Sequence, residues 1–155
     1  MSTHPTRSFE FVAVRGASRE LLGRDWPIAA GAVSRSPSGG AALLHFAPGR
    51  WLAPDPEAGL AARLDALVNA GAGLLADVTG KWQSITLPHA GAARVLAAGV
   101  ALDAVLAERG CAALWLFDCP VVLARAGERF DLWVQSSYAP SLIAALESVR
   151  TRIAA

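Results

Sequence analysis

Three strand-like runs late in the chain constrain the fold most, at residues 111–117, 121–125 and 130–135. They are short, rich in apolar residues, and separated by turns at 118–120 and 126–129, which predicts an antiparallel meander. Upstream, the pattern predicts two single helices at 54–70 and 88–99 among strands at 41–47, 50–53, 74–77 and 82–87. Strands that alternate with single helices and end in a meander predict an α+β fold with two layers, in which helices cover one face of a mostly antiparallel sheet.

Two of the helices have a clear apolar face. The helix at 54–70 places Leu60, Leu64, Leu67 and Val68 on one side and ends at Gly71. A final helix, capped by Ser136 or Ser137, turns four apolar side chains inward, namely Leu142, Leu146, Val149 and Ile153. A short helical piece is expected at 103–109.

The first forty residues have a weaker pattern. They suggest a strand at 9–14, a helical turn at 18–22 and a flexible connection at 34–40. We therefore expect one domain over 1–155, made of a poorly defined N-terminal segment (1–40) and a core (41–153), because 155 residues can bury a single sizeable core.

The chain is apolar and sparsely charged. Apolar residues make up 54% of it and charged residues 17%. Such a surface is poorly protected against association, which favours a subunit of a larger assembly. A general drift towards alanine explains the same numbers equally well. A net charge of +1 with scattered arginines argues against nucleic acid as a partner.

No membrane or export segment is expected. The longest apolar runs are interrupted by charges such as Arg94, Asp103 and Asp118, and residues 1–9 lack the pattern of a signal peptide. A cytoplasmic location is therefore the expectation.

The segment 77–83 superficially looks like a phosphate-binding loop. It combines Gly80 with Lys81, the one lysine of the sequence. However, six residues separate Gly73 from Gly80 where such a loop has four, and Trp82 stands where a hydroxyl should bind magnesium. Nucleotide binding is not expected, and Asp77 is interpreted as a residue that stabilises the turn.

No residues form a recognisable catalytic or metal site. The three histidines, His4, His45 and His89, lie far apart, and His45 is expected to have a structural role on a strand. Cys111 and Cys119 have the wrong spacing for a metal or redox pair, and Cys111 is expected in the core. Asp118 is interpreted as a turn residue. We therefore expect neither catalytic, cofactor-binding nor metal-binding residues in this chain.

The tryptophans are the candidates for contact with a partner. Trp82 and Trp133 share strand parity with polar residues, so they either cover the sheet within the chain or anchor a partner. Arg50 and Trp51, which follow a Pro-Gly turn, form a further candidate contact pair. Trp115 lies on a strand that is apolar on both faces and is expected in the core.

Several motifs in a fixed order carry a family resemblance over roughly residues 41–153. They are Asp-Val-Thr-Gly-Lys-Trp (77–82), Gly-Ala-Ala-Arg-Val-Leu (91–96), Leu-Asp (102–103), Gly-Cys-Ala (110–112), Val-Val-Leu-Ala-Arg (121–125), Phe-Asp-Leu-Trp-Val (130–134) and Ser-Tyr-Ala (137–139). In this order they resemble the gamma subunit of heterotetrameric sarcosine oxidase. That subunit is similar to the folate-binding aminomethyltransferase (glycine-cleavage T-protein) fold, so the resemblance implies ferredoxin-like split βαβ units.

The resemblance also implies a function. The chain would be a non-catalytic subunit that stabilises the large (alpha) subunit of a complex that demethylates sarcosine to glycine and passes the one-carbon unit to tetrahydrofolate. FAD, FMN, NAD and tetrahydrofolate would then be bound by the partner subunits and not by this chain. Two alternatives remain at this point: a stand-alone folate-binding or aminomethyltransferase-like protein, and a homo-oligomeric module unrelated to one-carbon metabolism.

Overall fold

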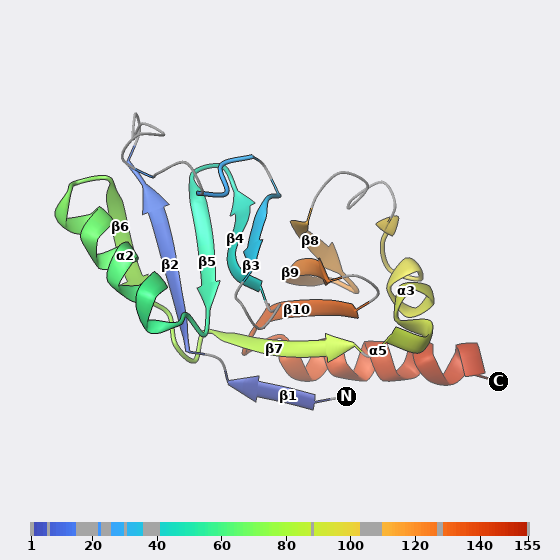
Figure 1. Cartoon of the computed structure of the whole chain (residues 1–155). Helices are drawn as coiled ribbons and strands as arrows, with labels where there is room; N and C mark the ends of the chain where they lie inside the picture. The colour runs from blue at the N-terminus through green and yellow to red at the C-terminus, as the bar shows by residue number, and fades with distance from the viewer. Residues whose placement is uncertain are drawn as a thin grey trace.

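Two antiparallel five-stranded sheets form the framework of the protein (Figure 1). The structure is a computed structural model that describes residues 2–5, 7–14, 22, 26–29, 31–35, 41–87, 89–102, 110–126 and 129–154. Sheet A has the strand order β1-β7-β10-β9-β8, with bounds Ser2–Pro5, Trp82–Leu87, Arg129–Gln135, Cys119–Ala126 and Cys111–Leu116. Sheet B has the order β3-β4-β5-β2-β6, with bounds Val33–Arg35, Ala41–Ala47, Arg50–Pro54, Ser8–Ala13 and Gly73–Asp77.

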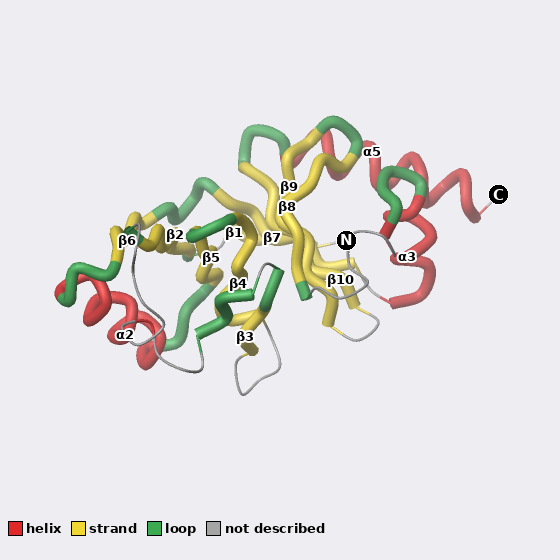
Figure 2. Tube along the Cα trace, turned by 90° about the horizontal axis from the view of Figure 1, so that it is seen from above, coloured by secondary structure: helices red, strands yellow, loops and turns green. Residues whose placement is uncertain are grey.

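The described helices cover the outer faces of the two sheets. Helix α2 (Ala58–Asn69) lies beside β6 and β2 of sheet B, and helices α3 (His89–Ala97) and α5 (Ala139–Ala154) lie on sheet A (Figures 1 and 2). Leu64 and Leu67 of α2 are buried in the core of sheet B, where Leu60 and Val68 also pack. Leu142, Leu146 and Val149 of α5 are buried in the core of sheet A, and Ile153 packs against them. These are the inward faces that the sequence predicted.

A third apolar cluster joins the two sheets. It contains Leu44 and Leu52 from sheet B and five residues from sheet A, namely Trp82, Cys111, Val122, Ala124 and Trp133. Along β10, Leu132 and Val134 instead belong to the core beneath the helices. Since successive side chains of a strand point to opposite faces, sheet A is covered by helices on one face and partly by sheet B on the other.

The chain crosses between the sheets twice, at adjacent places. Strand β1 lies beside β7 in sheet A, and β2 lies beside β6 in sheet B, so the β1–β2 and β6–β7 connections run side by side. The backbone N–H of Val78 donates to the carbonyl of Ser8 (2.8 Å), and the Thr79 hydroxyl accepts from the Ser8 N–H (3.2 Å). The segment 77–81 therefore connects the two sheets.

Two turns show how the local sequence ends a helix and joins two strands. Gly71, at φ +72°, follows Ala70, the C-cap residue of α2, and adopts the left-handed conformation that ends helices. Phe117 and Asp118 both have positive φ (49° and 61°) and join β8 to β9. Two positive values are typical of the tight hairpin turns that match strand twist, and aspartate tolerates this conformation well. The turn role predicted for Asp118 is confirmed.

The α+β class with antiparallel sheets is confirmed, but the strands form two sheets and not one. Residues 2–5, which lie within the N-terminal segment of weaker pattern, form β1 and pair with β7. The strand expected at 9–14 is β2, which lies between β5 and β6 inside sheet B. Most of the helical turn expected at 18–22, most of the connection at 34–40 and the helical piece at 103–109 lie outside the described residues.

Gly73 provides a test of the packing of sheet B. A Cβ atom at this position would lie 2.4 Å from Cζ of Phe11 and 2.5 Å from the carbonyl oxygen of Val12. Because the second contact is with backbone, the strand pair must shift. We expect Gly73→Ala to lower the free energy of unfolding by about 1–3 kcal/mol, measured by urea denaturation.

Gly59, in helix α2, is the matched control, because a Cβ atom there meets nothing within 4 Å. Gly59→Ala should leave the stability unchanged or raise it, as alanine is the better helix former. Equal stability of the two variants would contradict the packing described for β6.

Candidate functional site

A buried carboxylate, Glu10, lies at the junction of the two sheets. Its side chain points from β2 of sheet B and accepts three hydrogen bonds. They come from Nζ of Lys81 (2.6 Å), Nη2 of Arg50 (2.8 Å) and Nε1 of Trp82 (3.0 Å). The three donors come from the β6–β7 turn, the start of β5 and the start of β7. Glu10 therefore ties sheet B to the first residues of β7 in sheet A.

The environment of Glu10 keeps it charged. Burial raises the pKa of the carboxyl group, but the hydrogen bonds from Lys81, Trp82 and Arg50 and the charge of Lys81 outweigh it, so the pKa lies below the ordinary value of 4.5. Arg50 and Lys81 remain partly exposed, at 46% and 40% of their side-chain surface. Their charged groups are thus held in place from beneath while they face solvent.

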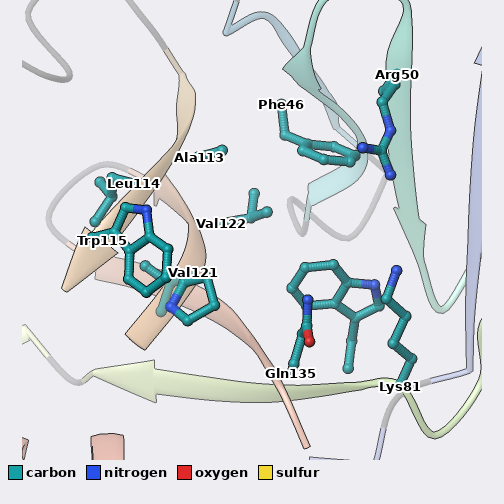
Figure 3. Close-up of a pocket in the computed structure, with 11 residues that line it drawn as sticks. Phe46, Arg50, Lys81, Ala113, Leu114, Trp115, Val121, Val122 and Gln135 are labelled. Atoms are coloured by element: carbon teal, nitrogen blue, oxygen red, sulfur yellow. The ribbon is translucent and has the colours of Figure 1, made fainter. Parts of the chain in front are cut away.

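Beside this cluster is a pocket of about 270 Å³ between the sheets, which we call the inter-sheet groove (Figure 3). Sheet B and the β6–β7 turn supply one wall, and the ends of β8, β9 and β10 supply the other. Its lining residues are Phe46, Arg50, Lys81, Trp82, Ala113, Leu114, Trp115, Pro120, Val121, Val122 and Gln135. Arg50 and Lys81 lie across the groove from Trp115 in Figure 3.

Both cations of the groove also lie over aromatic rings. The guanidinium carbon of Arg50 is 5.3 Å from the ring centre of Phe46, and Nζ of Lys81 is 5.3 Å from the ring centre of Trp82. Contacts of this kind add modestly to the ion pairs with Glu10 and restrict where the two side chains can move.

The tryptophans predicted as partner contacts are buried within this chain. Trp51, Trp82 and Trp133 expose only 3%, 5% and 5% of their surface. Trp82 and Trp133 lie on the polar parity of their strands because sheet B covers that face. Of the two roles left open by the sequence, cover within the chain accounts for their position. Contact with a partner stays a prediction for these residues and for the half-exposed Arg50.

The expectation that Trp115 lies in the core is wrong. The sequence placed it in the core, but 67% of its surface is exposed. It shares a strand face with Cys111, whose thiol donates weakly to the carbonyl of His45 (3.7 Å). Sheet B covers the beginning of β8 but leaves its end open, so the indole of Trp115 faces the inter-sheet groove.

The remaining candidates have structural roles. The Thr79 N–H donates to Oδ1 of Asp77 (2.9 Å), which confirms the turn predicted there. Hydrogen bonds from the side chain and the N–H of Thr79 hold the Asp77 pKa below its ordinary value. His45 is buried, stacks on Trp51 at 4.5 Å, and has Nδ1 2.9 Å from the carbonyl of Ala29. Burial raises the pKa of the Cys111 thiol to about 12, so this core cysteine is unreactive.

No group of three or more potential metal ligands occurs within the described ranges. In the same part of the chain, none of the helices combines the length and the apolar character needed to cross a bilayer.

The sequence reasoning missed Glu10 and the inter-sheet groove. A single carboxylate between Phe9 and Phe11 on a strand was a usable signal, because a charge within an apolar strand needs a partner. The identity of its partners could not be read from the sequence, since Arg50 and Lys81 are 40 and 71 residues away.

Comparison with known proteins identifies a solved structure with a similar fold. No family model matches the sequence, and no curated protein matches it. Among solved structures, the chain is similar to one chain of the heterotetrameric sarcosine oxidase from Corynebacterium sp. U-96, solved in complex with pyrrole 2-carboxylate. The TM-score is 0.78 and the identity 24%, over 97% of this chain and 82% of that chain. A structure of aspartokinase alpha and beta subunits matches with a TM-score of 0.44 and 13% identity, over 97% and 96% of the two chains, which is too low to establish a common fold.

The Glu10 cluster predicts a pH-dependent contribution to stability. At about pH 7, we expect Glu10→Gln to lower the free energy of unfolding by about 1–3 kcal/mol, because a buried charged acceptor is lost. The folded-state pKa of Glu10 lies below the ordinary value, so this contribution is present above pH 4.5 and is lost as the pH falls through the folded-state pKa. The difference between wild type and variant should therefore shrink at low pH.

Urea denaturation over a pH series measures this difference. Glu147→Gln on the exposed side of α5 is the control and should match wild type throughout. If the difference in the free energy of unfolding between wild type and Glu10→Gln stays constant down to about pH 3, the charge of Glu10 is not the cause of that difference.

Proposed function

We propose that this chain is a gamma-type subunit of a sarcosine oxidase-like complex, in which it binds and stabilises the large (alpha) subunit. The complex as a whole would demethylate sarcosine oxidatively to glycine and transfer the one-carbon unit to tetrahydrofolate. The contribution of this chain is a shaped surface and not a reacting group. On this proposal all 155 residues act as one gamma-like domain in a cytoplasmic assembly.

The observation that carries the proposal is the extent of the structural match. A TM-score of 0.78 over 97% of this chain means that both sheets are matched together and not one of them alone. The matched chain comes from a heterotetrameric enzyme. A protein with this arrangement therefore has a precedent as part of an assembly.

Exposed apolar side chains support a role in an assembly. Leu74 on the edge strand β6 exposes 69% of its surface, and Trp115 exposes 67%. Large side chains with this exposure are favourable anchors for a second protein. FAD, FMN, NAD and tetrahydrofolate belong to the partner subunits in this proposal.

Co-expression tests the proposal. The tagged chain, produced together with the large subunit of a sarcosine oxidase-like complex, should co-elute with that subunit in size-exclusion chromatography with light scattering. Omission of this chain should lower the yield of folded large subunit and its sarcosine-dependent oxygen uptake. A chain that elutes as a monomer while the folded large subunit is present would refute the proposal.

The stand-alone alternative makes a different prediction. A folate-binding or aminomethyltransferase-like protein would bind tetrahydrofolate without any partner, and calorimetric titration of the purified chain would then give saturable heat. The subunit proposal expects no binding heat from the chain alone.

A further inference from the structure

The inter-sheet groove combines an exposed aromatic wall with fixed positive charges. Trp115 on β8 forms the aromatic side, and Pro120, its pairing partner on β9, lies beside it. Arg50 and Lys81 form the charged side. An apolar surface next to charge is complementary to an occupant that has both characters.

The charge of the groove is positive. Its lining contains the two cations and no carboxylate. Glu10 lies beneath them and neutralises one charge, so Arg50, Lys81 and Glu10 together carry a formal charge of +1. The hydrogen bonds to Glu10 use Nη2 of Arg50 and one proton of the Lys81 ammonium group. Because a guanidinium has five N–H donors and an ammonium three, donors remain for an anionic group in the groove.

The two charged groups are already positioned. Glu10 and the rings of Phe46 and Trp82 restrict Arg50 and Lys81 before any ligand arrives. Preorganised groups lose less conformational entropy on binding, which favours association. Trp115 likewise needs no rearrangement to become accessible, since 67% of its surface is already exposed.

The form of the groove favours a segment of a protein as its occupant. Enclosed small-molecule pockets usually measure about 300–1,000 Å³ and bury most of their ligand. This groove, at about 270 Å³, is close in volume to the smallest of these pockets, but it is bordered by the exposed residues Ala113 and Trp115 and so does not enclose a ligand. The groove lining contains two cations, Arg50 and Lys81, which is fewer than the basic stripe that a nucleic acid requires.

We propose that the inter-sheet groove is the site at which this chain binds the large subunit, through a segment that presents an acidic side chain to Arg50 and Lys81 and a neighbouring apolar side chain to Trp115. This inference rests on the proposed function and adds the surface and the chemistry of the contact.

Variants of two exposed groove residues test the aromatic and the charged contribution separately. Trp115→Ala removes the aromatic wall, and we expect it to weaken binding to the large subunit at least about tenfold. Ala113, exposed on the same strand face as Trp115, allows a charge test without loss of any contact. Ala113→Glu should weaken binding several-fold, whereas Ala113→Lys, of similar length, should bind as tightly as wild type or more tightly.

Binding is measured by interferometry with the full chain and the purified large subunit, and urea denaturation verifies that each variant is folded. Val14→Ala is the control, because Val14 is also an exposed apolar side chain (45%) but does not line the groove. It should lower the affinity less than Trp115→Ala does.

The outcomes separate the two proposals. If the wild-type chain does not bind the large subunit, the proposed function fails and this inference fails with it. If the wild-type chain binds the large subunit, and both Trp115→Ala and Ala113→Glu bind it as tightly as wild type, then only the assignment of the groove as the binding site is refuted. If Ala113→Glu and Ala113→Lys lower the affinity for the large subunit equally, the claim that the bound segment carries an acidic side chain is refuted. A dimer of this chain that is lost in Trp115→Ala, without effect on the large subunit, would assign the groove to a second copy instead.

Discussion

The carboxylate of Glu10 is the interaction on which the relation between the two sheets depends. It is buried where the chain crosses from one sheet to the other, and a buried charge is tolerated only with partners. Its partners are the first residues of β5 and β7 and the end of the crossing segment. The same bonds hold Arg50 and Lys81 at the edge of the groove. A structural requirement of the fold thus also creates a fixed positive surface.

Sheet A shows why residues of similar type have different environments. Its helix-covered face buries Leu132 and Val134, and its other face buries Trp82 and Trp133 only where sheet B reaches it. The same face continues along β8 to Trp115, which sheet B does not bury and which exposes 67% of its surface. The exposure of Trp115 therefore follows from the limited overlap of the two sheets and not from its own strand.

The sequence predicted local elements far better than their assembly. Strands β4 and β7 have the predicted bounds because alternation and turn residues are local signals. Alternation also placed Trp82 and Trp133 on one face correctly. It could not tell that a second sheet, built largely from residues 8–77, would cover that face, because this contact joins distant parts of the chain. Trp115 was wrongly expected in the core because the sequence also could not tell that the second sheet stops short of the end of β8. Glu10 was missed because its partners are remote in sequence.

The high apolar content now has a structural explanation that separates it from the question of partners. Two sheets with outer helices and a junction require three apolar clusters, and these contain most of the large apolar side chains that the structure describes. Composition alone is therefore weak support for an assembly. The position of the remaining exposed residues is stronger support, because Trp115 lies opposite Arg50 and Lys81 in one groove. An aromatic side chain that served only the stability of this chain would gain more from burial than from such a place.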